Sequence, residues 1–479
     1  MMAFGDDSDE LSTRLLSEHE GEEASQPTLS VADHESSADS DYELISARET
    51  LVFEDEIRLL RAGKNQGPQS FVQTYLMDKI QPGSVKGSMF TMTVAIVGAG
   101  VLSLPYAVQR AGLLLGLLLI TGGAVVTNFS LRLLLTCSEL TQSRSYMDLA
   151  HTTGGPRLAG FTQFVVCLNL FGTSVGYLVG SAELLQLAIK SFAKDSSTSV
   201  LTNREDLILI LAVFFVLPLA LFRSLESLRF TSLFSIFCIV FMALVIVIKY
   251  FQFVHLGYAP TISYQLHHLK LFDFRIHRLL TAIPLVIFVY TCHPNVLPIY
   301  LVLKRRSSPR MYKVMNRSIG LSATVYALCG AFVVLTFGEH TKSNFLKNDY
   351  HHDVAVLIGC IGFSIALILT VPLFIHTLRD NIREALLRNQ RLNVFKHAVL
   401  SIFLVLAVFV VAEVSGDIAS VLGVLGATTN PVICFVLPAY FIYRVGPSKY
   451  ATHKLLAGTI AVVAIVIGVA SVVQQVRAA

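Results

Sequence analysis

Residues 98–105 read Gly98-Ala99-Gly100-Val101-Leu102-Ser103-Leu104-Pro105, and residues 292–298 read Cys292-His293-Pro294-Asn295-Val296-Leu297-Pro298. Each stretch interrupts an apolar segment long enough to cross a membrane, because glycine and proline weaken or end helices. A peptide group left unpaired in hydrocarbon is costly, so such interruptions persist only where protein or a water-filled cavity supplies partners. The two stretches therefore predict a binding site inside a membrane.

The composition divides the chain into an acidic start and an apolar, basic remainder. Charged residues make up 15% and hydrophobic residues 53% of the chain, which is typical of a membrane protein. The first 60 residues carry 17 acidic and 3 basic side chains and have little apolar periodicity, so we expect a disordered tail. We divide the chain into an acidic cytoplasmic tail (1–70), a juxtamembrane segment (71–85), an eleven-helix transmembrane domain (86–475) and a short C-terminal end (476–479).

Several classes of protein lose support from the absence of their motifs. The chain has no GxxxxGK[ST] phosphate loop, no HExxH motif and no CxxC pair. We therefore expect no enzymatic activity, no metal or cofactor, and no nucleic-acid partner. The cysteines fall within predicted spans or at their ends, at Cys137, Cys167, Cys238, Cys292, Cys329, Cys360 and Cys434.

Apolar runs long enough to cross about 30 Å of hydrocarbon occur eleven times. The predicted spans are 86–109, 112–137, 158–189, 206–222, 228–251, 277–302, 314–338, 353–378, 396–414, 417–443 and 454–475.

The distribution of Lys and Arg among the loops predicts the orientation of these spans. The alternate loops beginning after the second span hold 17 basic residues, including the cluster from Lys304 to Lys313, and the opposite set holds 10. Positive loops resist translocation, so we expect a cytoplasmic N-terminus. Spans one to five and six to ten then enter the membrane in opposite directions, with span eleven appended. Interruptions in matching helices of two such halves indicate the midplane site of a secondary transporter.

The two interruptions suit the two charged ends of an amino acid. Free N–H groups at a resumed helix attract a carboxylate, and Gly98, Ala99 and Gly100 allow close approach, with Val101, Leu102 and Ser103 beside them. Pro294 supplies no N–H, so carbonyl groups at Cys292 and His293 are expected to bind an ammonium group or a cation. Taken alone, a Gly-x-Gly pair is equally typical of a packing face and a single proline of a simple kink.

The residues around both interruptions resemble a known family. The stretch 94–107, VAIVGAGVLSLPYA, is similar to the first-helix signature of the amino acid/auxin permease family. The stretch 292–300, CHPNVLPIY, resembles the system A and system N branch of sodium-coupled neutral amino acid transporters. Residues 369–372 (LTVP) and 421–438 (VLGVLGATTNPVICFVLP) resemble the eighth and tenth helices of that branch.

This resemblance, which covers residues 85–475, implies an all-α fold of eleven helices with a LeuT-like inverted repeat. It implies transport of amino acids, neutral ones in particular, across the bilayer by alternating access. Carried over to this chain, it places substrate against Gly98 to Leu102, against Tyr290, Thr291, Cys292, His293 and Asn295, and beside Thr173 and Tyr177.

One position departs from the family pattern. Val94 stands where the family usually has an asparagine that helps to hold sodium, and an isopropyl group cannot coordinate a cation. Thr370 could supply a hydroxyl, or it could bond to its own helix. His293, at the predicted midplane, could respond to protons or hydrogen-bond loose backbone. Coupling to Na⁺, coupling to H⁺ and uncoupled uniport all remain open.

The acidic tail contains short segments that resemble trafficking signals. Asp55 with Leu59 and Leu60 matches an acidic dileucine pattern, and Tyr42 with Ile45 matches a tyrosine-based one. They favour trafficking adaptors as partners and an endolysosomal or vacuolar membrane over the plasma membrane. The alternative for 51–60 is an amphipathic helix.

Three functions fit these observations. A secondary transporter of neutral amino acids explains most of them. An amino acid receptor that signals through the tail is a second possibility, and a channel is a third, although two breaks of unlike sequence do not form a ring of selectivity carbonyls.

Overall fold

The first predicted span consists of two helices with an interruption between them. In the computed structural model, α4 (Val85–Ile96) ends before Gly98, one turn of 3₁₀ helix follows as η3 (Ala99–Leu102), and α5 (Leu104–Ala111) completes the span. The structure describes residues 83–192, 203–222, 229–351, 353–387 and 393–478. The predicted tail, with Tyr42, Ile45, Asp55, Leu59 and Leu60, lies outside these ranges.

The rest of the described chain is also helical. Two short π-helical segments, η5 and η9, interrupt longer helices. In chain order the elements are α6 (Leu113–Thr141), α7 (Tyr146–Phe192), α8 (Arg204–Leu211), η5 (Ala212–Val216), α9 (Leu217–Leu221), α10 (Arg229–His255), α11 (Ile262–His268), α12 (Ile276–Val289), α13 (His293–Leu301), α14 (Ser308–Phe337), η7 (Gly338–His340), η8 (Phe345–Lys347), α15 (Val354–Leu387), α16 (Val394–Val414), α17 (Ile418–Ala427), α18 (Thr429–Pro431), η9 (Val432–Val436), α19 (Leu437–Val445), η10 (Ser448–Tyr450) and α20 (Ala451–Ala478).

Nine helical stretches within the described residues are long and apolar enough to cross a membrane. The chain is therefore a multi-pass, all-α membrane protein. The first predicted span is not among the nine because it is interrupted, and the fourth corresponds to the short run α8, η5 and α9. The number eleven and the cytoplasmic N-terminus stay predictions.

Two helices begin earlier than predicted. The third span was expected at 158–189, yet α7 starts at Tyr146 and bends at Gly155, whose φ is +73°, immediately before Pro156. The backbone angles at Gly155 are not helical, so a short helical stretch that begins at Tyr146 precedes the apolar run and the chain changes direction between the two. The seventh span was expected from 314, and α14 starts at Ser308 with Pro309 in its first turn, where proline costs no hydrogen bond.

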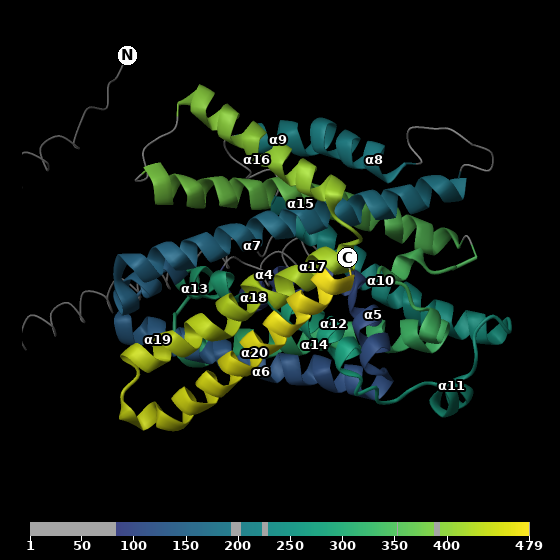
Figure 1. The fold of residues 1–479 in the computed structure, drawn as a ribbon, viewed down its shortest axis with the longest axis horizontal. Coiled ribbons are helices and arrows are strands. Elements are labelled where there is room, and N and C mark those ends of the chain that lie inside the picture. The colour runs from purple at the N-terminus through teal and green to yellow at the C-terminus, as the bar shows by residue number, and fades with distance from the viewer. Residues whose placement is uncertain (1–82, 193–202, 223–228, 352, 388–392, 479) are drawn as a thin grey trace, which may run out of the picture. The chain divides into compact units, whose positions relative to one another are not determined.

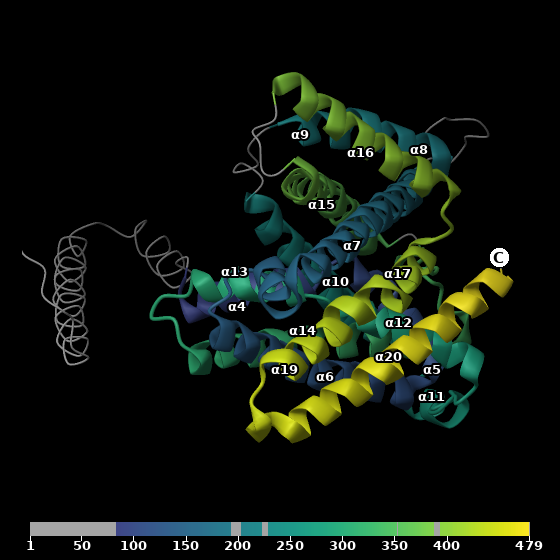
Figure 2. The same cartoon turned by 60° about the vertical axis from the view of Figure 1, so that its left-hand side comes forward.

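Close helix contacts bring the two interrupted helices together. α7 lies along α15, and α12 contacts α5, α17 and α20 (Figures 1 and 2). Every fourth residue on one face of α7 is a glycine, which lets α17 approach closely. Hypothetical Cβ atoms at Gly172, Gly176 and Gly180 would lie 2.5, 2.9 and 2.5 Å from side-chain atoms of Leu425, Leu422 and Ile418.

Candidate functional site

The first interruption is an extended residue followed by a tight turn. Gly98 has φ −120° and ψ −148°, so the α-helical hydrogen-bond ladder stops there. Its N–H donates to the Ile96 carbonyl at 3.1 Å, and its own carbonyl accepts from Val101 N–H at 3.3 Å. Ser103 N–H donates to the Gly100 carbonyl at 3.2 Å. The predicted interruption is therefore present, with Ala99, Gly100, Val101 and Leu102 all buried.

The Tyr177 hydroxyl from α7 occupies the open side of this turn. It accepts a hydrogen bond from Ala99 N–H at 3.2 Å, and its ring packs edge-on against Phe374 with centroids 5.0 Å apart. A Cβ at Gly98 would lie 2.1 Å from the hydroxyl oxygen. Only glycine leaves room for this contact. The N–H group that the sequence predicts for a carboxylate therefore has a neutral oxygen as its partner in this structure.

The second interruption falls between α12 and α13. α12 ends at Val289, and α13 begins at His293 with Pro294 in its first turn, where the missing N–H would have no helical partner in any case. The Cys292 carbonyl oxygen already accepts from Asn295 N–H at 3.0 Å, so at most one lone pair is left for an ammonium group, and its role in binding stays a prediction. Thr291 donates through Oγ1 to the Ile287 carbonyl at 3.1 Å.

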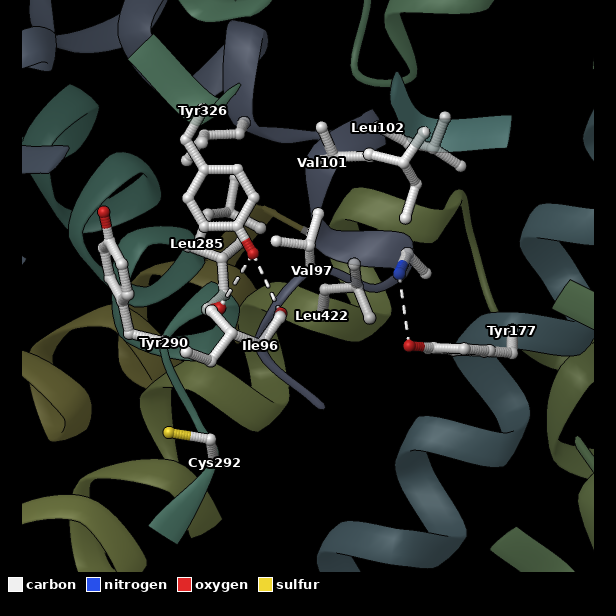
Figure 3. Packing of buried hydrophobic residues seen from close by; sticks show 14 of the residues in the cluster. Ile96, Val97, Val101, Leu102, Tyr177, Leu285, Tyr290, Cys292, Tyr326 and Leu422 are labelled. Carbon is white, nitrogen blue, oxygen red and sulfur yellow. Dashed lines mark hydrogen bonds between the residues drawn. The ribbon is translucent and has the colours of Figure 1, made fainter. Parts of the chain in front are cut away.

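A single side chain from α14 joins the two interruptions. The Tyr326 hydroxyl lies 2.9 Å from the carbonyl oxygen of Ile96 and 3.0 Å from that of Val289 (Figure 3). These oxygens belong to the last residues of α4 and α12, where a helix leaves carbonyl groups unpaired. A Cβ at Gly100 would lie 2.4 Å from Val289 Cγ1. The two breaks are thus direct neighbours.

Three buried polar atoms beside the breaks lack hydrogen-bond partners within the described residues. They are Ser103 Oγ, the Tyr290 hydroxyl and His293 Nδ1. Ser103 and His293 have exposed fractions of 0%, and that of Tyr290 is 1%. Burying an unsatisfied donor or acceptor costs about 1–3 kcal/mol, and native proteins retain few of them. Three such atoms around two adjacent breaks indicate a place for a polar ligand.

His293 also belongs to a network with the π-helical segment η9. Its Nε2 lies 3.2 Å from Ser130 Oγ on α6, and this hydroxyl donates in turn to the Cys434 carbonyl. The Cys434 thiol lies 3.4 Å from Thr291 Oγ1. A π-helical turn shifts the backbone ladder, so side chains can reach its carbonyl groups. His293 is therefore linked to η9 through the Ser130 hydroxyl, and no hydrogen bond from its ring to backbone at the break is present among the described residues.

A polar cluster between α7 and the interruption of the tenth helix was missed by the sequence analysis. Asn169 Nδ2 donates to Thr429 Oγ1 at 2.9 Å and to Asn430 Oδ1, and Thr173 donates to the Asn169 carbonyl at 2.7 Å. Thr428, with ψ −80°, separates α17 from α18. The signal was available, because Thr428-Thr429-Asn430-Pro431 is a polar run inside an apolar span.

Three residues that were considered from the sequence do not face the breaks as ligands. The Asn295 side chain is exposed, and only its N–H contacts Cys292. Thr370 Oγ1 donates to the Ala366 carbonyl of its own helix at 2.7 Å. Val94 lies half-buried on α4, one turn before the break, and brings no oxygen there.

Comparisons with known proteins identify the family and the fold. A family model described as "Transmembrane amino acid transporter protein" matches residues 81–478. A protein of Danio rerio named sodium-coupled neutral amino acid symporter 2 is 28% identical over 384 residues, which are 76% of each chain. A solved structure of MhsT in complex with L-phenylalanine superposes with a TM-score of 0.52 at 13% identity, covering 81% of this chain and 98% of that one. The predicted LeuT-like fold is confirmed.

Proposed function

Because the chain belongs to the transmembrane amino acid transporter protein family, we propose that it moves neutral amino acids across a membrane, with the substrate held where the first and sixth helices are interrupted. As a member of this family it is a secondary transporter rather than an enzyme. The observation that carries the proposal is the Tyr326 hydroxyl, which reaches the terminal carbonyl groups of α4 and α12 at once.

The carboxylate end of the substrate is proposed to bind at Ala99. In the structure Ala99 N–H donates to the Tyr177 hydroxyl, and Ser103 Oγ has no partner among the described residues. An arriving carboxylate accepts from Ala99 N–H and Ser103 Oγ, and the Tyr177 hydroxyl then donates to the carboxylate. The exchange at Ala99 N–H replaces a neutral hydrogen bond by a charge-assisted one, which is roughly twice as strong, and the bonds from Ser103 Oγ and the Tyr177 hydroxyl are added to it.

The ammonium end is proposed to face the end of α12. The Val289 carbonyl oxygen has two lone pairs and accepts from Tyr326, so one lone pair is left for the substrate. The carbonyl end of a helix also carries the negative end of the helix dipole. A zwitterion therefore finds opposite partial charges at the two breaks, in the order that the sequence predicts.

Substitution of Gly100 tests this site. We expect Gly100→Ala to reduce uptake of labelled neutral amino acids into proteoliposomes by tenfold or more, because the added methyl group meets Val289 Cγ1 at 2.4 Å and pushes the breaks apart. The matched control is Gly122→Ala in α6, where a Cβ would meet no atom within 4 Å. Size-exclusion chromatography and thermal unfolding report whether both variants fold.

Two results would count against the proposal. Equal uptake by the Gly100→Ala and Gly122→Ala proteins would show that the contact between the breaks is not part of the transport site. The unmodified protein could also fail to take up any neutral amino acid of a panel above the level of empty liposomes. That result would contradict the proposed transport function itself.

A further inference from the structure

An open groove of about 740 Å³ lies between the beginning of α12 and the end of α20. It is on a different part of the molecule from the breaks, since α12 reaches the breaks only at its opposite end. Gln474 fixes the geometry of the groove, because its Nε2 donates to the His277 carbonyl at 2.8 Å. α12 and α20 lie in contact (Figure 2), and the groove runs along this contact.

The groove has an aliphatic wall. Ile276 and Leu280 supply one side from α12, and Ala470 and Val473 supply the other from α20. The side chain of Ile276 is 74% exposed and that of Val473 is 45% exposed. Both helices are long and apolar enough to cross a membrane, so apolar side chains exposed along them are expected to meet acyl chains.

The end of the groove is basic. Arg275 and Arg477 line it, and Arg477 is exposed and makes no ion pair within the described residues. Arg275 and Arg278 share one carboxylate, Asp273, whose Oδ2 lies 2.5 and 3.2 Å from their guanidinium nitrogens.

The nearby Glu339 pairs with Lys270 at 3.2 Å, so the four basic side chains of Lys270, Arg275, Arg278 and Arg477 are balanced by only the two carboxylates of Asp273 and Glu339 among these residues. The surroundings of the groove therefore keep an excess of positive charge, which attracts an anion.

The basic end lies at the level of lipid headgroups. α20 has 28 residues, and at 1.5 Å per residue it is about 42 Å long, which exceeds the roughly 30 Å of hydrocarbon. Because its terminal turn carries the polar Gln474 and the charged Arg477, we expect this end of α20 to reach the interfacial region. The wall formed by Leu280 and Ala470 lies one to two turns deeper.

We propose that this groove binds one anionic phospholipid, with its phosphate between Arg275 and Arg477 and one acyl chain along the aliphatic wall. A soluble anion would explain the arginines but not the aliphatic wall, which faces the hydrocarbon. A zwitterionic lipid would explain the wall but would gain little from the excess positive charge. Only a lipid with a net negative headgroup matches both the basic end and the aliphatic wall of the groove.

The test measures lipid binding to the purified full-length protein by native mass spectrometry. The probes are dioleoyl phosphatidylglycerol and dioleoyl phosphatidylcholine, added in equal amounts. We expect the protein to retain phosphatidylglycerol in preference. Arg477→Gln should weaken its binding about fivefold, the effect of one basic residue near a membrane surface. Ala470→Phe should weaken the binding of both lipids, because the larger side chain would fill the space beside the aliphatic wall where the acyl chain is proposed to lie.

The matched control is Lys454→Gln, which removes the same charge near the opposite end of α20. Equal losses in the Arg477→Gln and Lys454→Gln proteins would overturn the proposal, because they would show attraction to overall charge. Retention of the two lipids in equal amounts would overturn it as well. Displacement of phosphatidylglycerol by inorganic phosphate would reveal a site for free anions instead. None of these outcomes depends on transport.

Discussion

At the scale of single residues, Tyr326 has the largest role in holding the breaks together. Its hydroxyl is within hydrogen-bond distance of the Ile96 and Val289 carbonyl oxygens, and its ring packs edge-on against Tyr290 at 5.5 Å. We expect Tyr326→Phe to lower stability by about 1–3 kcal/mol, the usual cost of an unsatisfied buried polar group. Uptake should fall as well, because the end of α12 loses its fixed position. Thermal unfolding and proteoliposome uptake measure the two effects.

The chain offers a matched control for this substitution. Tyr350 is also buried, and its hydroxyl has no partner within the described part of the chain. Tyr350→Phe should therefore leave stability and uptake nearly unchanged. If both variants behaved alike, the bridging hydroxyl of Tyr326 would be unimportant, and the link between the breaks would have to come from packing alone.

The sequence predicted where the backbone is interrupted but not what pairs with it. Gly98, Gly100 and Pro294 identify the breaks locally, since these residue types weaken helices wherever they occur. The partners Tyr177 and Tyr326 come from α7 and α14, 78 and 230 residues away from the groups of the first break that they contact. Nothing in the local pattern selects them, because helix packing alone determines which side chains reach the breaks.

At the scale of elements, the connection between α11 and α12 is tied to the end of α5. Asp273 N–H donates to the Ala111 carbonyl at 2.7 Å, and the Lys270 carbonyl accepts from Leu113 N–H at 3.0 Å. The Asp273 carboxylate is 2.5 Å from the Arg275 guanidinium. This connection positions the start of α12, and therefore the direction in which α12 approaches the first break.

The ion pair at Asp273 predicts a pH-dependent contribution to stability. The hydrogen bond from Arg275 lowers the pKa of the Asp273 carboxyl well below its ordinary value. A depressed pKa in the folded state stabilises the protein above the unfolded value of about 3.9, and this contribution is lost as the pH falls below that value. We expect Asp273→Asn to lower the melting temperature at pH 7, and the difference from the unmodified protein to shrink below about pH 4. A difference that stays constant down to pH 3 would contradict this account.

The elements themselves were predicted well where apolar runs are long and less well where they end. α7 and α14 extend beyond their predicted starts. Their first turns mix buried apolar residues, Tyr146 and Leu149 in α7 and Met311 in α14, with polar and charged ones, which weakens the apolar signal there. The π-helical turn η9 was not anticipated, since a π turn depends on the ladder of a longer helix rather than on composition. Its preceding polar run at Thr429 and Asn430 was visible in the sequence and was read only as part of a family signature.

At the scale of the whole molecule, Val94 makes the driving ion a property in which this chain can be tested against its named relative. The Danio rerio protein is named as sodium-coupled, whereas this chain has Val94 and a Thr370 hydroxyl that donates within its own helix. We propose that transport does not require Na⁺, and we expect uptake with choline in place of sodium to stay within about twofold. A tenfold loss of uptake in choline would contradict this proposal. It would indicate that sodium binds through oxygen atoms of residues other than Val94.

The membrane in which the protein works is proposed from the tail. The dileucine pattern with Asp55, Leu59 and Leu60 supports recognition by trafficking adaptors and an endolysosomal or vacuolar location. Replacing both leucines by alanine should move a fluorescently tagged protein toward the plasma membrane, as seen by microscopy. Replacement of Leu15 and Leu16, which form a pair with less regular acidic spacing, serves as the comparison. An unchanged distribution of the variant that lacks Leu59 and Leu60 would contradict the proposal that this dileucine pattern directs the protein to its membrane.

The overall architecture could be predicted from the sequence because a bilayer restricts spanning segments to a few lengths and shapes. The long apolar helices, the two interrupted spans and the all-α fold follow from that restriction. The detailed site does not follow from it, because Tyr177, Tyr326 and Ser130 reach the breaks from three different helices. Such convergence is a property of the packed molecule.

The most direct measurement of the central claim is an experimental structure of the protein with a transported amino acid bound. We expect ligand density between Ala99 and Val289, with the carboxylate on Ala99 N–H and Ser103 Oγ, and the Tyr177 hydroxyl moved from Ala99 N–H to the carboxylate. Density elsewhere in the molecule, with the contact between Tyr177 and Ala99 unchanged, would contradict the account.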